Sequence, residues 1–192
     1  QRTWQALASQ TPCVVVASLE EFLDTLLAFQ NLTIRPSRPT QNVVLFGNGG
    51  GTGVLATDSF AECGLDIKPF AEQTLTELEA LGLPPGTSVV NPIDTPVATL
   101  QQEEGWIAGK ILDRIYQNGN PDAVVMHLNL ASFVGRGDND PVNNLIKIAE
   151  QGQGSYTGRG DFVLVLRSKG SPALDEIKRK HRRQALAVGI PV

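Results

Sequence analysis

Short apolar runs alternate with amphipathic segments along most of this chain. The apolar runs end at polar or glycine-rich residues and predict strands, at residues 13–17, 43–46, 65–69, 89–90, 123–130 and 162–166. The segments between them place apolar residues three and four positions apart and predict helices, at residues 19–27, 53–63, 75–81, 106–115 and 141–148 and after 171. Strands that are apolar on both faces and alternate with helices are typical of a parallel sheet covered by helices. The pattern therefore predicts an α/β, doubly wound, mainly parallel fold.

The chain has 192 residues, which suits one domain, or one domain with a piece of another. Residues 33–41 form a polar connector with two prolines and no hydrophobic periodicity, which is typical of a linker between domains. The chain begins without Met, and its last residues look like the start of a strand. These features suggest a fragment of a longer protein.

A glycine-rich loop, NVVLFGNGGGTGVLATD, covers residues 42–58 and joins a predicted strand directly to a predicted helix. Glycine lets a ligand approach the main chain closely. The first N–H groups of a helix lack main-chain partners and lie at its positive dipole end. A strand, a glycine loop and a helix N-terminus together predict an anion site, most often for phosphate. The candidate phosphate-binding residues are Asn48, Gly49, Gly50, Gly51, Thr52 and Gly53.

Two common nucleotide-binding loops fit this segment less well. No Lys follows the glycines, so the segment is not the loop that holds a nucleoside triphosphate in Walker-type proteins. Residues 51–56 do fit a relaxed dinucleotide pattern. The next predicted strand, however, offers only Asp66 at its start, which is the wrong end to bind a ribose. Dinucleotide or flavin binding stays the weaker alternative.

Other polar residues follow predicted strands and are candidates for lining the same cleft, because ligands of open α/β sheets bind at the carboxyl ends of the strands. They are Asn91, Asp94, Asn129 and Arg136. A proline-fixed turn explains Asn91 and Asp94 equally well. His127 lies within an apolar strand and is interpreted as a core residue, and His181 lies in a basic helix. Neither belongs to a nucleophile–histidine–acid grouping, so no catalytic residue is predicted.

Composition excludes several classes of protein. The net charge of −4 gives no overall basic field for nucleic acid or a membrane surface. No apolar run is long enough to span a bilayer, and no signal peptide is visible. The only two cysteines form no metal-binding spacing or disulfide framework, which predicts no metal site and a cytoplasmic location.

The motifs resemble those of a known family when they are taken in order. GNGGGTGVLATDSFAECGLDI, LPPGTSVVNPID and DAVVMHL resemble the NDP-forming acyl-CoA synthetases, the superfamily of ADP-forming acetate–CoA ligase and succinyl-CoA synthetase. The likeness covers residues 42–192 and implies the second flavodoxin-like CoA-ligase domain of that family. Residues 1–32 look like the last strand and helix of the preceding CoA-ligase-type domain, joined by the 33–41 linker.

The resemblance implies a ligase that converts an acyl-CoA, phosphate and a nucleoside diphosphate into the acid, CoA and a nucleoside triphosphate. An acyl phosphate forms, and a histidine of another domain carries its phosphoryl group to the nucleotide. By position, the main-chain N–H groups of Gly50, Gly51, Thr52 and Gly53 would bind phosphate. CoA, the nucleotide and Mg²⁺ would be handled by the full-length protein, with no cofactor tightly bound here.

The implied partners are an upstream domain that binds CoA and carries the phosphohistidine, and an ATP-grasp domain or subunit. None of these lies in this chain, and neither His127 nor His181 matches the phosphorylated histidine. The segment alone is therefore expected to be inactive. The alternative is a non-catalytic acyl-CoA- or nucleotide-sensing or docking domain of a larger protein, such as a lysine acetyltransferase.

Overall fold

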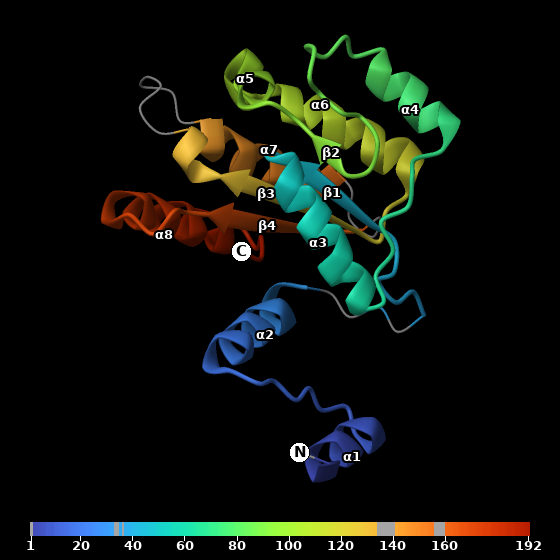
Figure 1. Ribbon diagram of the computed structural model, residues 1–192, viewed down its shortest axis with the longest axis vertical. Coiled ribbons are helices and arrows are strands. Elements are labelled where there is room, and N and C mark those ends of the chain that lie inside the picture. The colour runs from blue at the N-terminus through green and yellow to red at the C-terminus, as the bar shows by residue number, and fades with distance from the viewer. Residues whose placement is uncertain (1, 33–34, 36, 134–140, 156–159) are drawn as a thin grey trace. The chain divides into compact units, whose positions relative to one another are not determined.

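The computed structural model describes residues 2–32, 35, 37–133, 141–155 and 160–192 (Figure 1). The chain divides into two compact units, Gln1–Ile34 and Arg35–Val192. The boundary lies inside the connector that the sequence predicts to be a linker. The assignment of the first unit to a preceding domain stays a prediction.

The first unit contains two helices, α1 (Arg2–Gln10) and α2 (Leu19–Asn31). Ser18 begins α2 as its N-cap: its hydroxyl accepts a hydrogen bond from the Glu21 N–H at 3.1 Å, and the Glu21 carboxylate accepts one from the Ala17 N–H. The arrangement is similar to a capping box, except that the carboxylate binds the residue before the N-cap. Residues 13–17, where a strand was predicted, form none, because the described part of this unit holds no second strand for them to pair with.

The second unit is built on four parallel strands in the order β2-β1-β3-β4. They are β1 (Val43–Gly47), β2 (Ile93–Asp94), β3 (Ala123–Asn129) and β4 (Asp161–Arg167). Residue pairing aligns Gly47 with His127 and Asn129 with Arg167, so the carboxyl ends of three neighbouring strands meet at one edge. The predicted parallel α/β fold is confirmed.

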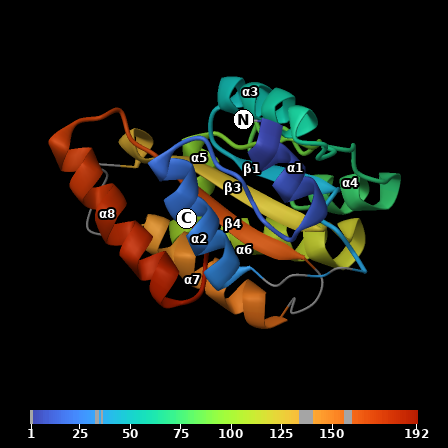
Figure 2. The same cartoon turned by 90° about the horizontal axis from the view of Figure 1, so that it is seen from below.

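Helices connect the strands on both sides of the sheet, with α3 on one face and α6 and α7 on the other (Figures 1 and 2). Their bounds are α3 (Gly50–Glu62), α4 (Glu72–Glu79), α5 (Val97–Leu100), α6 (Ile107–Arg114), α7 (Pro141–Ser155) and α8 (Pro172–Ala187). Short 3-10 or π turns lie at Gln102–Gly105, Ile115–Gly119 and Leu130–Ser132. No helix in the described ranges is long and apolar enough to cross a membrane.

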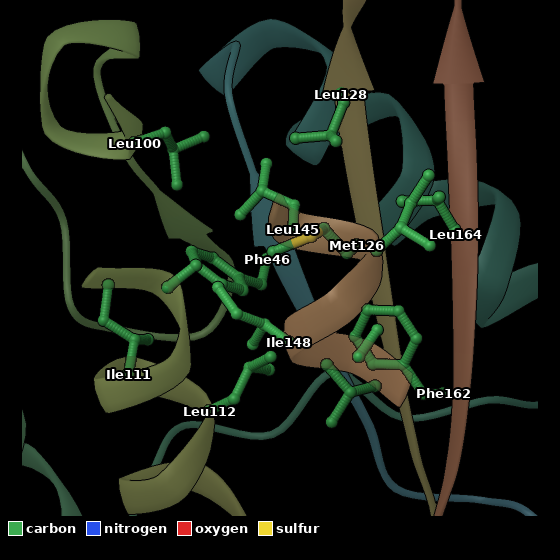
Figure 3. Packing of buried hydrophobic residues seen from close by; sticks show 14 of the residues in the cluster. Phe46, Leu100, Ile111, Leu112, Met126, Leu128, Leu145, Ile148, Phe162 and Leu164 are labelled. Atoms are coloured by element: carbon green, nitrogen blue, oxygen red, sulfur yellow. The ribbon is translucent and has the colours of Figure 1, made fainter. Parts of the chain in front are cut away.

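The main core lies between the sheet and helices α5, α6 and α7. Alternate residues of β1, β3 and β4 point to this side, as expected from the period of two along a strand. The side chains shown in Figure 3 include Phe46, Met126, Leu128, Phe162 and Leu164 from the strands, and Leu100, Ile111, Leu112, Leu145 and Ile148 from the helices. This core fixes the strands and therefore the positions of their carboxyl ends.

The opposite face of the sheet carries α3 and is less completely covered. Leu45 in β1 is buried beneath that helix, whereas Val165 in β4 is 45% exposed. His127 and Arg167 lie on this face, since they alternate with the core residues Met126, Leu128 and Leu166. Strand β4 was predicted to be apolar on both faces, and the structure shows that its second face is open to solvent.

Two predicted elements lie elsewhere in the structure. The expected strand at 65–69 is reduced to a single parallel bridge between Asn42 and Asp66. The expected strand at 89–90 is replaced by β2, which pairs only at Ile93 and Asp94. Helix α3 begins at Gly50, three residues before its predicted start, because the glycines themselves adopt the first helical turn.

Part of the predicted linker is bound to the second unit. Arg35 forms an ion pair with Asp161, and Arg38 forms one with Asp122 at 2.8 Å. Burial favours a raised pKa at Asp122, but the main-chain N–H groups of Asn42 and Gln41 and the Arg38 guanidinium outweigh it and lower the pKa. The connector thus ends in a fixed segment that leads into β1.

Candidate functional site

The glycine loop leaves β1 without breaking its pairing to β3. The Asn48 N–H donates to the His127 carbonyl at 3.3 Å, and the Asn48 side-chain oxygen accepts from the Asn129 N–H at 2.9 Å. Asn48 is 4% exposed. Of the predicted phosphate-binding residues, Asn48 therefore uses its side chain to bind the main chain of β3, and this holds the start of the loop in place.

Gly49 turns the chain from the strand into α3. Its φ of 114° and ψ of 87° lie in a region that L side chains rarely adopt, which explains the need for glycine. Its N–H donates to the Asp94 carboxylate at 2.9 Å. A Cβ on Gly50 would lie 2.7 Å from the other Asp94 oxygen, so a side chain at this position would require the carboxylate to shift.

The Asn91–Asp94 segment lies against this loop, with Ile93 and Asp94 pairing to the end of β1. Both the N–H and the hydroxyl of Thr95 donate to the Gly47 carbonyl at 2.8 Å. Gly53 is buried against Pro92, with 3.5 Å between the Pro92 Cβ and a Cβ built on Gly53. The loop and this segment therefore form one hydrogen-bonded unit at the carboxyl end of β1.

Only two of the four proposed main-chain donors remain available. The Thr52 and Gly53 N–H groups donate to the Gly49 carbonyl, at 2.9 and 3.3 Å. The Gly50 and Gly51 N–H groups have no acceptor among the described residues. A Cβ built on Gly51 meets no atom within 4 Å, so this residue borders open space. An anion at the start of α3 would therefore contact Gly50 and Gly51.

The remaining candidate residues have different surroundings. The Asn91 amide accepts from the Leu45 N–H at 3.0 Å and donates to the Val43 and Lys68 carbonyls at 2.9 Å, so it is taken up by the main chain. The Asn129 side-chain oxygen is buried and lacks a hydrogen bond within the described part of the chain. Arg136 lies outside the described residues. The cleft-lining roles stay predictions.

Two residues that the sequence did not predict to be functional lie at this edge. Arg167, at the end of β4, donates from Nη1 to the Thr52 hydroxyl at 2.5 Å. His127 lies beside Gly47 on the same face, where a Cβ on Gly47 would lie 2.8 Å from the His127 Cγ. Each is a polar residue at or near the end of an apolar strand, which is the signal that could have identified them.

Burial lowers the pKa of His127, the nearby Asp94 carboxylate partly opposes that shift, and the Arg167 guanidinium adds to it. The imidazole is therefore neutral at pH 7. The unfolded chain takes up this proton at a higher pH than the folded chain. The stability that His127 contributes is thus fully present above its unfolded pKa and is lost as the pH falls from there towards the lowered folded pKa.

We expect NMR to show His127 titrating below the ordinary imidazole pKa of 6.5. The chain has two histidines, and a His181→Gln variant assigns their resonances without touching β3. Arg167→Gln is expected to raise the His127 pKa, because it removes a nearby positive charge. A His127 pKa at or above 6.5 would contradict the burial and charge balance described for this site.

Two curated relatives match parts of the chain. The alpha subunit of ADP-forming acetate–CoA ligase I from Pyrococcus furiosus is 34% identical over 107 residues, 55% of this chain and 22% of the relative. ADP-forming acetate–CoA ligase from Methanocaldococcus jannaschii is 26% identical over 91 residues, 47% of this chain and 12% of the relative. The chain thus spans less than a quarter of either protein. No protein-family model matches it.

Solved structures agree with these relatives. The apo form of Candidatus Korarchaeum cryptofilum dinucleotide-forming acetyl-coenzyme A synthetase 1 has a TM-score of 0.71 and 18% identity, over 96% of this chain and 37% of that one. The same enzyme in complex with phosphate and ADP has a TM-score of 0.70, over 96% and 36%. At 18% sequence identity, the structural similarity shows only that the two proteins share a fold. The relatives support the family resemblance, and the solved structures share the fold.

This chain is similar to the NDP-forming acyl-CoA synthetases. Its parallel sheet, with helices on both faces, is a flavodoxin-like architecture. The resemblance that the sequence indicated is thereby confirmed.

Proposed function

We propose that this chain supplies the phosphate-binding domain of an NDP-forming acyl-CoA ligase. The observation that carries the proposal is the pair of N–H groups at Gly50 and Gly51, which have no acceptor in the described part of the chain and lie at the start of a 13-residue helix. Donors that are already oriented can stabilise charge on a transferring phosphoryl group without a side-chain base. The relatives named as ADP-forming acetate–CoA ligases support this choice of chemistry.

In the proposed reaction, phosphate attacks the acyl-CoA thioester, the acyl phosphate forms, and CoA leaves as the thiol. A histidine then takes the phosphoryl group and releases the acid, and the phosphohistidine passes the group to a nucleoside diphosphate. This chain would hold the phosphoryl group while these bonds change. The upstream domain would bring CoA and the histidine, and an ATP-grasp domain or subunit would bring the nucleotide with Mg²⁺, in the cytoplasm.

We expect inorganic phosphate, added to the 192-residue chain, to shift the amide resonances of Gly50 and Gly51 in ¹H–¹⁵N spectra. A hydrogen bond to an anion changes the shielding of these two N–H groups directly, whereas Thr52 and Gly53 keep their acceptor at Gly49. A chloride titration at equal ionic strength provides the control. Equal responses to both salts, or shifts confined to other segments, would contradict the proposed site.

A further inference from the structure

His127 and Arg167 occupy the same face of the sheet as the start of α3. Residue pairing places His127 beside Gly47 of β1 and Val165 of β4, and places Arg167 beside Asn129. Because Gly47 has no side chain, the imidazole can lie directly below the loop: a Cβ there would be 2.8 Å from the His127 ring. The two side chains therefore approach the loop from neighbouring strands.

Arg167 brings a full positive charge to the positive end of a helix. Its Nη1 donates to the Thr52 hydroxyl, and its Nη2 lies 3.8 Å from the position of a Cβ on Gly49. No acidic side chain of the described ranges forms an ion pair with it. The guanidinium and the helix N-terminus both favour an anion beside them, and the Asp94 carboxylate already lies at the helix start.

His127 gives an independent indication of a ligand. The side chain is polar and only 7% exposed, yet neither ring nitrogen forms a hydrogen bond within the described residues. The ring nitrogens are not among the fully buried atoms that lack a partner in the described residues, so they are open to solvent or to a ligand at the loop. The charged side chains that influence it are Asp94 and Arg167, which flank the loop on either side. An oxyanion bound at the loop would accept a hydrogen bond from the neutral ring.

Asp94 determines what kind of anion the site can hold. Its carboxylate is fixed by the Gly49 N–H at 2.9 Å and would repel a doubly charged phosphoryl group at Gly50 and Gly51. Arg167 is the cation that offsets this charge. A guanidinium also presents paired N–H groups that match two oxygens of one phosphoryl group, which a Lys ammonium cannot do.

We propose that Arg167 is the side-chain ligand of a phosphoryl dianion bound at Gly50 and Gly51, with His127 below it as a neutral hydrogen-bonding partner. This inference rests on the proposed phosphate-binding function and names the residue that makes the site selective for a phosphoryl group. Thr52 holds the guanidinium in place through its hydroxyl, whose proton stays free to be donated to the same anion. Arg167 and Thr52 are 115 positions apart in the chain, and only the fold joins them.

The test measures inorganic phosphate binding to the 192-residue chain by calorimetry at constant ionic strength. Arg167→Gln is expected to weaken binding roughly 10- to 100-fold, since hydrogen bonds to charged groups contribute that much. Arg167→Lys should recover part of the loss, because it restores charge without the paired geometry. Arg179→Gln is the matched control: it removes the same charge from an exposed side chain of α8 that is paired with Glu176.

Gly51→Asp separates this inference from the proposed function. Loss of binding in Gly51→Asp with wild-type affinity in Arg167→Gln would overturn the role of Arg167 and leave the loop as the site. Wild-type affinity in Gly51→Asp with weak binding in Arg167→Gln would overturn the loop and leave Arg167 as an anion ligand. Equal losses in Arg167→Gln and Arg179→Gln would show a general charge effect and overturn the inference. A wild-type chain that binds no phosphate would also overturn it.

Discussion

Gly51→Asp is expected to abolish phosphoryl transfer in a full-length ligase that carries this segment, lowering kcat by about 1000-fold or more. The new carboxylate would place a negative charge where the phosphoryl oxygens are proposed to bind, next to the charge of Asp94. The fold should survive. A Cβ at Gly51 meets nothing within 4 Å, and a carboxylate in the first turn of a helix interacts favourably with the helix dipole.

Gly51→Ala is the matched control for this experiment. It adds the same Cβ into the same open space and keeps the main-chain N–H, so we expect activity within a few fold of wild type. Nucleoside triphosphate formation measures the effect on catalysis, and thermal melting verifies that both variants fold. Full activity in Gly51→Asp would contradict the phosphate-binding function and favour the alternative of a non-catalytic sensing domain.

The hydrophobic pattern was sufficient to predict the three long strands and the helices between them. Strands β1, β3 and β4 carry continuous apolar runs because the core lies on one face and, for β1, helix α3 on the other. Strand β2 was misplaced because only Ile93 and Asp94 pair with β1. Two paired residues are too few to show a hydrophobic period. The strand was predicted instead at the apolar residues Val89 and Val90, which precede them.

The site could be predicted as far as it is local in sequence. The glycine loop and its helix are contiguous, so the sequence indicated an anion site there. The number of free donors was not predictable, because the Thr52 and Gly53 N–H groups turn back onto the Gly49 carbonyl only in the folded loop. Arg167 could not be linked to Thr52 without the strand order, which brings β4 beside β3. His127 was interpreted as a core residue because its neighbours are apolar, and it is indeed buried.

Asn91→Ala is expected to lower the free energy of unfolding by about 3–5 kcal/mol, because it leaves two buried main-chain groups and one partly buried carbonyl without this partner. The Asn91 amide bonds the N–H of Leu45 and the carbonyls of Val43 and Lys68. Strand β1 lies between β3 and β2, but β2 pairs only with its last two residues. Asn91 therefore supplies the hydrogen bonds that a longer β2 would make, and denaturant unfolding measures their contribution.

Asn118→Ala provides the comparison. The Asn118 amide donates to the partly buried carboxylate of Glu77 at 2.8 Å and forms no hydrogen bond with a strand. Its loss should cost under about 1 kcal/mol. A similar small cost for Asn91→Ala would show that β1 does not depend on that amide. A large cost accompanied by weaker phosphate binding would show that Asn91 acts on the site through β1. The Val43–Gly47 strand carries the glycine loop at its end, and any displacement of the strand moves Gly50 and Gly51 relative to Arg167.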